Sequence, residues 1–336
     1  MLVIDGSQGE GGGQILRTSL SMAMVTGTDI RIENIRAGRD KPGLMRQHLA
    51  CVNAAQTVSR AKVSGAEVGS TAITFKPKGI KAGDYRFAVG TAGSTTLIFQ
   101  TVLPALALVK DESRIFFEGG THNLYAPSFD FIALAYAPLL RRMGVAVEMQ
   151  LVRHGFYPQG GGQWQTVIRP SGRIGRLELR ERGRFLGHEA VVTSAHIPGH
   201  VAMRELAEIA KQCHWPDDVL KAEQVECMGS GNIVSMRLYY EQCSEVVESI
   251  GKVGVAAEKV AKRAIQALRR YQATPAPVGE HLADQLMLPM AIGEGGAFRT
   301  LQPSLHSQTN RHVIHLFTDK RFEFEALAKD LWEIRL

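Results

Sequence analysis

An internal repeat constrains the fold of this chain more than any other feature of its sequence. The tract Gln100-Thr101-Val102-Leu103-Pro104 matches the tract Gln285-Leu286-Met287-Leu288-Pro289 in spacing. Pro42 and Pro127 each precede a helix-like segment, and they lie about 85 residues apart. Such self-similarity is typical of one supersecondary unit used several times. The sequence therefore predicts a chain built from three copies of an α/β unit.

Two of the copies are continuous, and each combines two helices with several strands. Apolar residues at helical spacing mark the helices, and short runs rich in β-branched residues mark the strands. The helices are predicted at residues 15–27, 44–59, 95–109 and 128–143. The strands are predicted at residues 29–35, 61–68, 71–76, 114–118, 145–152 and 163–169.

The third copy is split by an insertion, because its Gln-to-Pro tract lies about 185 residues beyond that of the second copy. It is predicted to begin with a strand at 176–182 and to resume with a helix at 281–291. A partner helix begins near 306, and strands follow from about 313. We therefore expect a large three-repeat domain of residues 1–182 and 274–336, and an inserted small α/β domain of residues 183–273.

The insertion has its own alternation of strands, at 189–197 and 233–241, and helices, at 202–213 and 255–271. The second helix is strongly basic and carries Lys259, Lys262, Arg263, Arg269 and Arg270. Such a face could bind nucleic acid, but a solvated helix face is the commoner explanation.

The bulk properties indicate a globular intracellular protein, which we expect in the cytoplasm with no membrane association. The 336 residues are 45% hydrophobic, yet no apolar run approaches the roughly 20 residues that span a bilayer. The N-terminus lacks the pattern of a signal peptide, and the four cysteines include no C-x-x-C pair. The net charge of +6 is compatible with an anionic partner.

The glycine-rich opening, from Asp5 to Gly13, lies between an apolar run and a helix-like run. Glycine lets backbone N–H groups converge, and a helix N-terminus favours anions, so the turn suggests phosphate binding. A plain strand-to-helix connection is the alternative. The turn is neither a Walker A loop nor a dinucleotide fingerprint.

A cluster of cations follows this turn and strengthens the case for a phosphorylated ligand. Its five cations are Arg17, Arg36, Arg39, Lys41 and Arg46, and the neutral Gln47 belongs to the same cluster. Arginine suits forked contacts with phosphate oxygens, although a basic loop of this kind can also be ordinary surface. Glu10 could bridge phosphate through a divalent cation. From the pattern alone, a carboxylate that favours the helix dipole is the preferred role.

His306 stands at a predicted helix start, with Thr309 and Asn310 three and four residues further on. Its imidazole could face an incoming group. By pattern alone, a structural or surface histidine is the commoner case.

Motifs that contain these residues are shared with a known family: the chain resembles the RNA 3'-terminal phosphate cyclases over nearly its whole length. The matching stretches, in chain order, are Asp5 to Arg17, Arg36 to Arg39, Pro42 to Leu44, Gln47-His48, Gly83 to Phe87, His154 to Pro158, Leu282 to Gln285, and His306 with Thr309-Asn310. The insertion carries no such motif.

The resemblance implies a fold and an activity. The fold would be three βααβ-type repeats like the C-terminal domain of bacterial translation initiation factor three, with a smaller inserted α/β domain. The activity would be the conversion of an RNA 3'-terminal phosphate to a 2',3'-cyclic phosphate, with ATP and a divalent cation (Mg or Mn). The partner would be an RNA with a 3'-terminal phosphate.

The resemblance also implies residue roles. His306 would attack the α-phosphate of ATP and carry AMP, Glu10 would bind the metal, and His281 stands where relatives often have tyrosine. The nucleotide pocket would comprise Gln100, Pro127, His281, Leu282, Ala283, Asp284 and Gln285. The contacts to the RNA end or the triphosphate would come from Arg17, Arg36, Arg39 and Gln47.

Two other functions are alternatives to the cyclase activity. A catalytically silent cyclase relative that acts in ribosomal RNA processing would lack the nucleophilic histidine, so His306 argues against it. An enolpyruvyl transferase contains six repeated units, and this chain is too short for six.

Overall fold

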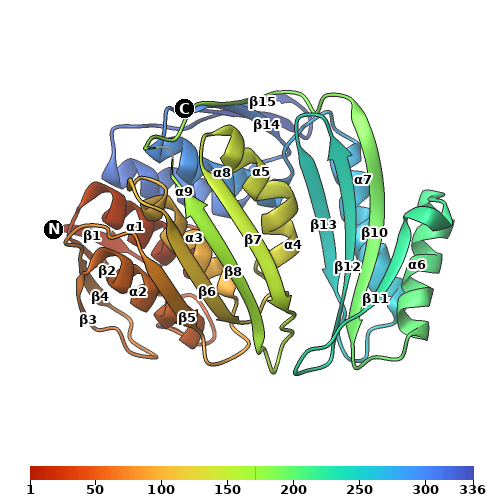
Figure 1. Cartoon of the computed structure of the whole chain (residues 1–336). Helices are drawn as coiled ribbons and strands as arrows, with labels where there is room; N and C mark the ends of the chain where they lie inside the picture. Colours follow the sequence, from red (N-terminus) through yellow and green to blue (C-terminus); the bar gives the residue numbers. More distant parts are fainter. Residues whose placement is uncertain (171) are drawn as a thin grey trace.

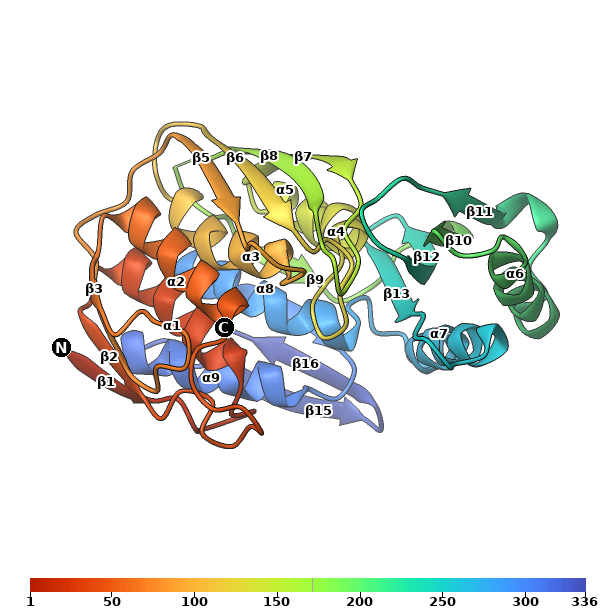
Figure 2. The ribbon, with the colours of Figure 1, turned by 90° about the horizontal axis from the view of Figure 1, so that it is seen from below.

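Four mixed four-stranded sheets form the β-structure of the computed structural model, which describes residues 1–170 and 172–336 (Figure 1). The chain is thus a mixed α/β structure, as the sequence predicts. Figure 2 shows three of the sheets around a central group of helices, with the fourth sheet and its helices to one side. None of the described helices is long and apolar enough to span a bilayer.

The first sheet has the order β1-β2-β4-β3, with β1 parallel to β2 and both other pairs antiparallel. Its strands are β1 (Leu2–Asp5), β2 (Ile30–Glu33), β3 (Lys62–Ser64) and β4 (Ile73–Lys76). Ile30 and Ile32 are buried and alternate with more exposed Arg31 and Glu33, as expected of a strand with one face on the core. The helices of this unit are α1 (Gly13–Thr26) and α2 (Arg46–Ser59).

The second sheet, of order β5-β6-β8-β7, repeats this pairing scheme. Its strands are β5 (Asp84–Ala88), β6 (Ser113–Gly119), β7 (Ala146–Arg153) and β8 (Gly162–Arg169). Its helices are α3 (Thr95–Leu106), α4 (Phe129–Phe131), the π-helical segment η1 (Ile132–Tyr136) and α5 (Ala137–Arg142).

The third sheet has the order β9-β14-β16-β15 and again begins with a parallel pair. Its strands are β9 (Leu177–Leu179), β14 (Gly296–Thr300), β15 (Glu323–Ala328) and β16 (Leu331–Arg335). Its helices are α8 (Glu280–Ile292) and α9 (Leu305–Phe317). Pro104 and Pro289 each lie inside their helices near the C-terminal end, where each removes the N–H that would bond the carbonyl four residues earlier.

Helix α1 occupies the centre of the molecule, in contact with α2, α3 and α9. Leu16, Leu20 and Met22 are fully buried, and nearly every residue after the first turn is buried too. A helix apolar on all sides must be surrounded by other elements. The Ser21 hydroxyl donates a 2.8 Å hydrogen bond to the Thr101 carbonyl and thereby ties α1 to α3.

The fourth sheet differs from the others in strand order, β11-β10-β12-β13, and has a separate apolar cluster that includes Val192, Val234 and Ile265. Its strands are β10 (Phe185–Ala195), β11 (Leu220–Gln224), β12 (Gly231–Tyr240) and β13 (Ser244–Ile250). Its helices are α6 (His200–Cys213), the short 3-10 turn η2 (Asp217–Val219) and α7 (Ala257–Gln272). Strand β13 contacts α4 and η1, so this sheet closes against the second unit.

One expectation about the third unit is wrong. Strands do not follow from about Val313, because α9 continues to Phe317 and β15 begins only at Glu323. The β-branched pair Val313-Ile314 favours a strand locally, but it extends the buried stripe that begins at Ser307 of α9.

Candidate active site

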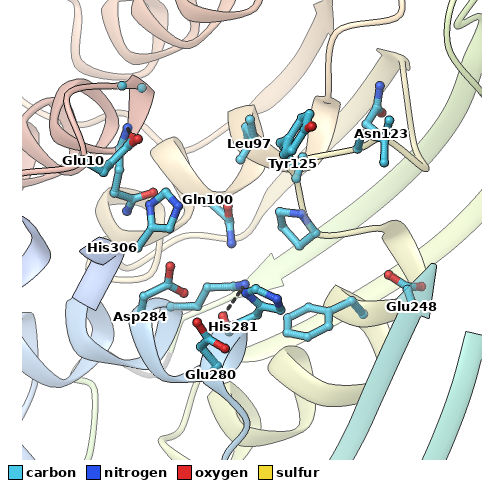
Figure 3. A pocket seen from close by; sticks show the side chains of 18 of the residues that line it. Glu10, Leu97, Gln100, Asn123, Tyr125, Glu248, Glu280, His281, Asp284 and His306 are labelled. Carbon is cyan, nitrogen blue, oxygen red and sulfur yellow. Dashed lines mark hydrogen bonds between the residues drawn. The ribbon is translucent and has the colours of Figure 1, made fainter. Parts of the chain in front are cut away.

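A cavity of about 850 Å³ opens where α1, α8 and α9 meet the fourth sheet (Figure 3). This volume lies within the range of ordinary ligand pockets. Figure 3 shows Glu10 and His306 at one end of the cavity, which we call the inner end, and Glu248 at the opposite, outer end. The cavity therefore extends from the glycine-rich turn to strand β13.

His306 lies in the first turn of α9, which Ser304 caps by accepting a 3.2 Å hydrogen bond from the Ser307 N–H. Its Nδ1 is buried and has no hydrogen-bond partner among the described residues, so Nε2 is the ring nitrogen with access to the cavity. Burial lowers the pKa of His306 below its usual 6.5, against the opposing charge of Glu10. The ring is therefore neutral at neutral pH and keeps a free electron pair for nucleophilic attack.

Asn310 holds the helix of His306 against two other helices. Its Oδ1 accepts hydrogen bonds from the Thr18 hydroxyl at 2.6 Å and from Gln14 Nε2 at 3.0 Å, both in α1. Its Nδ2 donates to the Asp284 carbonyl in α8 at 2.8 Å. His306 and Asn310 lie one turn apart, so this network fixes the side of α9 that carries the imidazole.

The glycine-rich turn is anchored to α9 and to the basic loop. The Glu10 N–H donates to the Thr309 hydroxyl at 3.1 Å, and a Cβ on Gly9 (φ +65°) would lie 2.2 Å from that hydroxyl. The Glu10 carboxylate forms an ion pair with Arg39 and accepts a 3.2 Å hydrogen bond from the Gln14 N–H, in the first turn of α1. Glu10 thus interacts with the helix N-terminus, as the plainer of its two sequence-based roles predicts.

The other predicted phosphate contacts also line the inner end of the cavity. Arg17 donates to Gln14 Oε1 at 2.5 Å, and burial lowers the pKa of its guanidinium. Arg36 folds back on its own loop and donates to the carbonyls of Lys41 and Gly43 at 2.6 and 2.9 Å. Gln47 completes the group. An anion bound here would contact Arg17 and Arg36, which already donate hydrogen bonds within the protein, and Arg39, which is paired with Glu10.

The residues predicted to bind the nucleotide separate into two groups. Those that line the cavity are Gln100, Pro127, His281, Asp284 and Gln285. Leu282 and Ala283 instead point into the apolar core, where they are 0% and 1% exposed. Along α8, the polar positions thus face the cavity and the apolar positions anchor the helix.

Buried polar atoms of α8 lack partners and suit a polar ligand. Asp284 Oδ1 and Gln285 Oε1 form no hydrogen bond within the described part of the chain. Burial raises the pKa of Asp284 to about 7, although the charge of Arg17 opposes this shift. Buried polar groups are normally satisfied, so these atoms are fit to receive the donors of a bound nucleotide.

A divalent cation would find one carboxylate at the inner end. No group of three or more His, Cys, Asp or Glu side chains could hold a metal within residues 1–170 and 172–336. Magnesium at phosphate sites is usually held by only one or two carboxylates together with substrate phosphates. Glu10, which also pairs with Arg39, fits such a role once phosphate is present.

Comparison with known proteins identifies the family. A family model described as RNA 3'-terminal phosphate cyclase matches residues 8–324. A Koribacter versatilis protein named RNA 3'-terminal phosphate cyclase is 48% identical over 324 residues, which are 96% of this chain and 91% of that protein. Proteins of the same name from Salmonella typhimurium and Pseudomonas fluorescens are each 46% identical over 97% of this chain, and 96% and 95% of their own lengths are covered. This chain belongs to the RNA 3'-terminal phosphate cyclase family.

The outer end of the cavity in this cyclase-family chain contains residues that sequence reasoning missed. They include Asn123, Tyr125, Glu245 and Glu248. The Ser128 hydroxyl donates to Glu248 at 2.6 Å, and burial raises the pKa of Glu248 to about 7. These residues come from a loop and from β13, which no shared motif links, so only the folded structure reveals that they face one cavity.

Proposed function

We propose that the protein converts an RNA 3'-terminal phosphate to a 2',3'-cyclic phosphodiester with ATP, through a covalent histidine–AMP intermediate. Family membership supports the overall reaction. The observation that carries the mechanism is the neutral imidazole of His306, which faces a cavity also lined by Arg17 and Arg39. A nucleophile beside fixed cations is the arrangement that phosphoryl chemistry needs.

In the first step, Nε2 of His306 attacks the α-phosphorus of ATP. The N–P bond forms while the bond between the α-phosphorus and the bridging oxygen breaks, and pyrophosphate leaves. Asp284 and Gln285 would receive polar groups of the adenosine, and Pro127 and His281 would flank it. The cations Arg17, Arg36 and Arg39, with Gln47, would hold the phosphates.

In the second step, an oxygen of the RNA 3'-phosphate attacks the same phosphorus. The N–P bond breaks, His306 is released, and the RNA carries AMP as RNA(3')pp(5')A. The adjacent 2'-hydroxyl then loses its proton and attacks the RNA phosphorus, and AMP leaves. This closure needs little assistance, because the hydroxyl is held next to its target. A divalent cation (Mg or Mn) near Glu10 would supply charge neutralisation for the phosphates.

We also propose that the three similar sheets are βααβ-type repeats like those of the C-terminal domain of translation initiation factor three. Their common pairing scheme supports this proposal. Residues 183–273 would be a small α/β domain inserted in the third repeat, and residues 1–182 and 274–336 would form the catalytic domain. The separate apolar cluster around Val192 and Ile265 supports the division.

The alternative is a non-catalytic cyclase-like protein that acts in ribosomal RNA processing. Such a protein has no need of a nucleophile. The access of His306 to the cavity and its lowered pKa favour the enzyme.

Adenylylation tests the proposal directly. Wild-type protein is incubated with α-labelled ATP and a divalent cation and then denatured. We expect a covalent label that is acid-labile and alkali-stable, is lost in His306→Ala and is retained in His315→Ala. His315 is an exposed histidine of the same helix and is a matched control. An unlabelled wild-type protein, or a labelled His306→Ala variant, contradicts the mechanism.

A further inference from the structure

Tyr125 is a fully exposed aromatic residue at the edge of the cavity. Its relative exposure is 100%, and its backbone has φ +62°, a left-handed conformation that is costly for a residue with a Cβ. Its hydroxyl forms no hydrogen bond with any described residue. Asn123, two residues earlier, anchors the loop by donating to the Ala92 carbonyl at 2.5 Å. Figure 3 shows Tyr125 and Asn123 on the side of the cavity opposite His281 and Glu280.

Helix α7 forms another part of the wall and presents cations of two kinds. Lys262 pairs with Glu208 at 3.4 Å, Arg269 donates to the Gln212 carbonyl at 2.8 Å, and Arg270 pairs with Glu280. Arg263 lines the cavity as Arg270 does, but it is exposed and has no hydrogen bond or ion pair with the described residues. Lys259, one turn earlier on the same side of α7, is likewise exposed and unpaired within the described chain.

We infer that Tyr125 and Arg263 bind the RNA strand upstream of its 3'-terminal phosphate, with Tyr125 stacked on a base and Arg263 paired with a backbone phosphate. This inference rests on the proposed function. The buried atoms of Asp284 and Gln285 suit a nucleotide deep in the cavity, whereas an exposed ring at its edge suits a longer chain. Single-stranded RNA is typically bound by such a combination of aromatic rings and unpaired cations.

Burial and pairing reduce the negative charge that the acidic residues of the outer end present to this path. Burial raises the pKa of Glu245 to about 8 and that of Glu248 to about 7. Glu245 accepts a 3.1 Å hydrogen bond from the Gly279 N–H, and Glu280 is neutralised by Arg270. Among the described residues of α7, the unpaired cation that lines the cavity is Arg263, and Lys259 lies one turn earlier.

The test measures binding of a 5'-fluorescent RNA decamer with a 3'-phosphate, in the absence of ATP, by fluorescence anisotropy. We expect Tyr125→Ala to raise Kd at least about fivefold, because one base–aromatic stack is lost. Tyr125→Phe should bind as the wild type does. Arg263→Ala should reduce the slope of log K against log salt by about 0.7, the value for one phosphate on a single strand. A dinucleotide with a 3'-phosphate should bind all these proteins equally.

Two variants serve as matched controls. Tyr157→Ala removes an exposed tyrosine outside the cavity, and Arg269→Ala removes an arginine of α7 that faces α6. Both should bind the decamer like the wild type. Equal losses for decamer and dinucleotide, no loss for the decamer, or a raised KM for ATP in adduct formation by Tyr125→Ala would overturn the inference. If no adduct forms in the wild type, the proposed catalysis fails, but the anisotropy result still decides whether RNA follows this path.

Discussion

The Thr18 hydroxyl and the Asn310 side-chain oxygen lie 2.6 Å apart and join α1 to α9 by a buried hydrogen bond. Through this contact, the helix that follows the glycine-rich turn is fixed relative to the helix that presents His306. Asn310 also reaches Gln14 and the Asp284 carbonyl. One amide therefore sets the relative positions of the proposed nucleophile, phosphate contacts and nucleotide contacts.

Asn310→Ala should lower the free energy of unfolding by about 2–4 kcal/mol, because one buried and two partly buried polar partners lose their hydrogen bonds. Chemical denaturation measures this loss. Asn53→Ala, at an exposed position of α2, is the control and should change stability by less than about 0.5 kcal/mol. Equal effects of the two substitutions would show that the Asn310 network contributes nothing to stability.

The rate of adduct formation should depend on pH as the lowered pKa of His306 dictates. A protonated imidazole has no free electron pair, so the rate falls as pH drops through the pKa of His306. Because that pKa lies below 6.5, the rate should be half-maximal at a pH below 6.5. Single-turnover labelling from pH 5 to 8 measures the profile.

Asp284 requires its own control in this experiment, because its pKa is raised to about 7 and its titration would add a second limb. Asp284→Asn removes that limb and leaves the one due to His306. A half-maximal rate at or above pH 6.5 in Asp284→Asn would contradict the lowered pKa of His306.

Gly13→Ala should impair adduct formation and lower the stability of the fold. The new Cβ would lie 2.6 Å from His48 Nε2 and 2.7 Å from Arg17 Nη1. The arginine tip can move away, but the His48 ring is buried and its Nδ1 accepts a hydrogen bond from the Met45 N–H, so the free energy of unfolding should also fall. Displacing the Arg17 guanidinium by about 1 Å should slow labelling by roughly ten- to hundredfold. Gly38→Ala, which meets open space in the neighbouring basic loop, should label normally. Normal labelling of Gly13→Ala would show that the Arg17 position is unimportant.

The helices were largely predictable from the sequence, because a long run of apolar residues at helical spacing fits a helix and not a strand. The predicted helix at 15–27 is α1, and the predicted helix at 202–213 is α6. Strands whose residues are mostly exposed or lack a regular alternation were not predictable from the sequence. Strand β5 (Asp84–Ala88) is mostly exposed, and β11 (Leu220–Gln224) contains no buried residue, so neither has the alternation that marks a strand.

The inner end of the site followed from family motifs, and its residues do line one cavity apart from Leu282 and Ala283. The outer end did not follow, because Tyr125, Glu248 and Arg263 share no motif and come from a loop, a strand and a helix. Their proximity is a product of how the fourth sheet closes against the second unit. The sequence also did not indicate that Glu10 and Arg39 pair with each other, since this contact depends on the conformation of two loops.

The hydrogen bond from the Glu10 N–H to the Thr309 hydroxyl joins residues that are 299 positions apart. During synthesis, almost the whole polypeptide must therefore be made before Thr309, the partner of the glycine-rich turn, leaves the ribosome. Contacts of such long range close late in folding, because loop closure must precede them. A product that lacks α9 cannot form the site, because α9 carries both His306 and Thr309. The proposed adenylylation would therefore require the finished polypeptide.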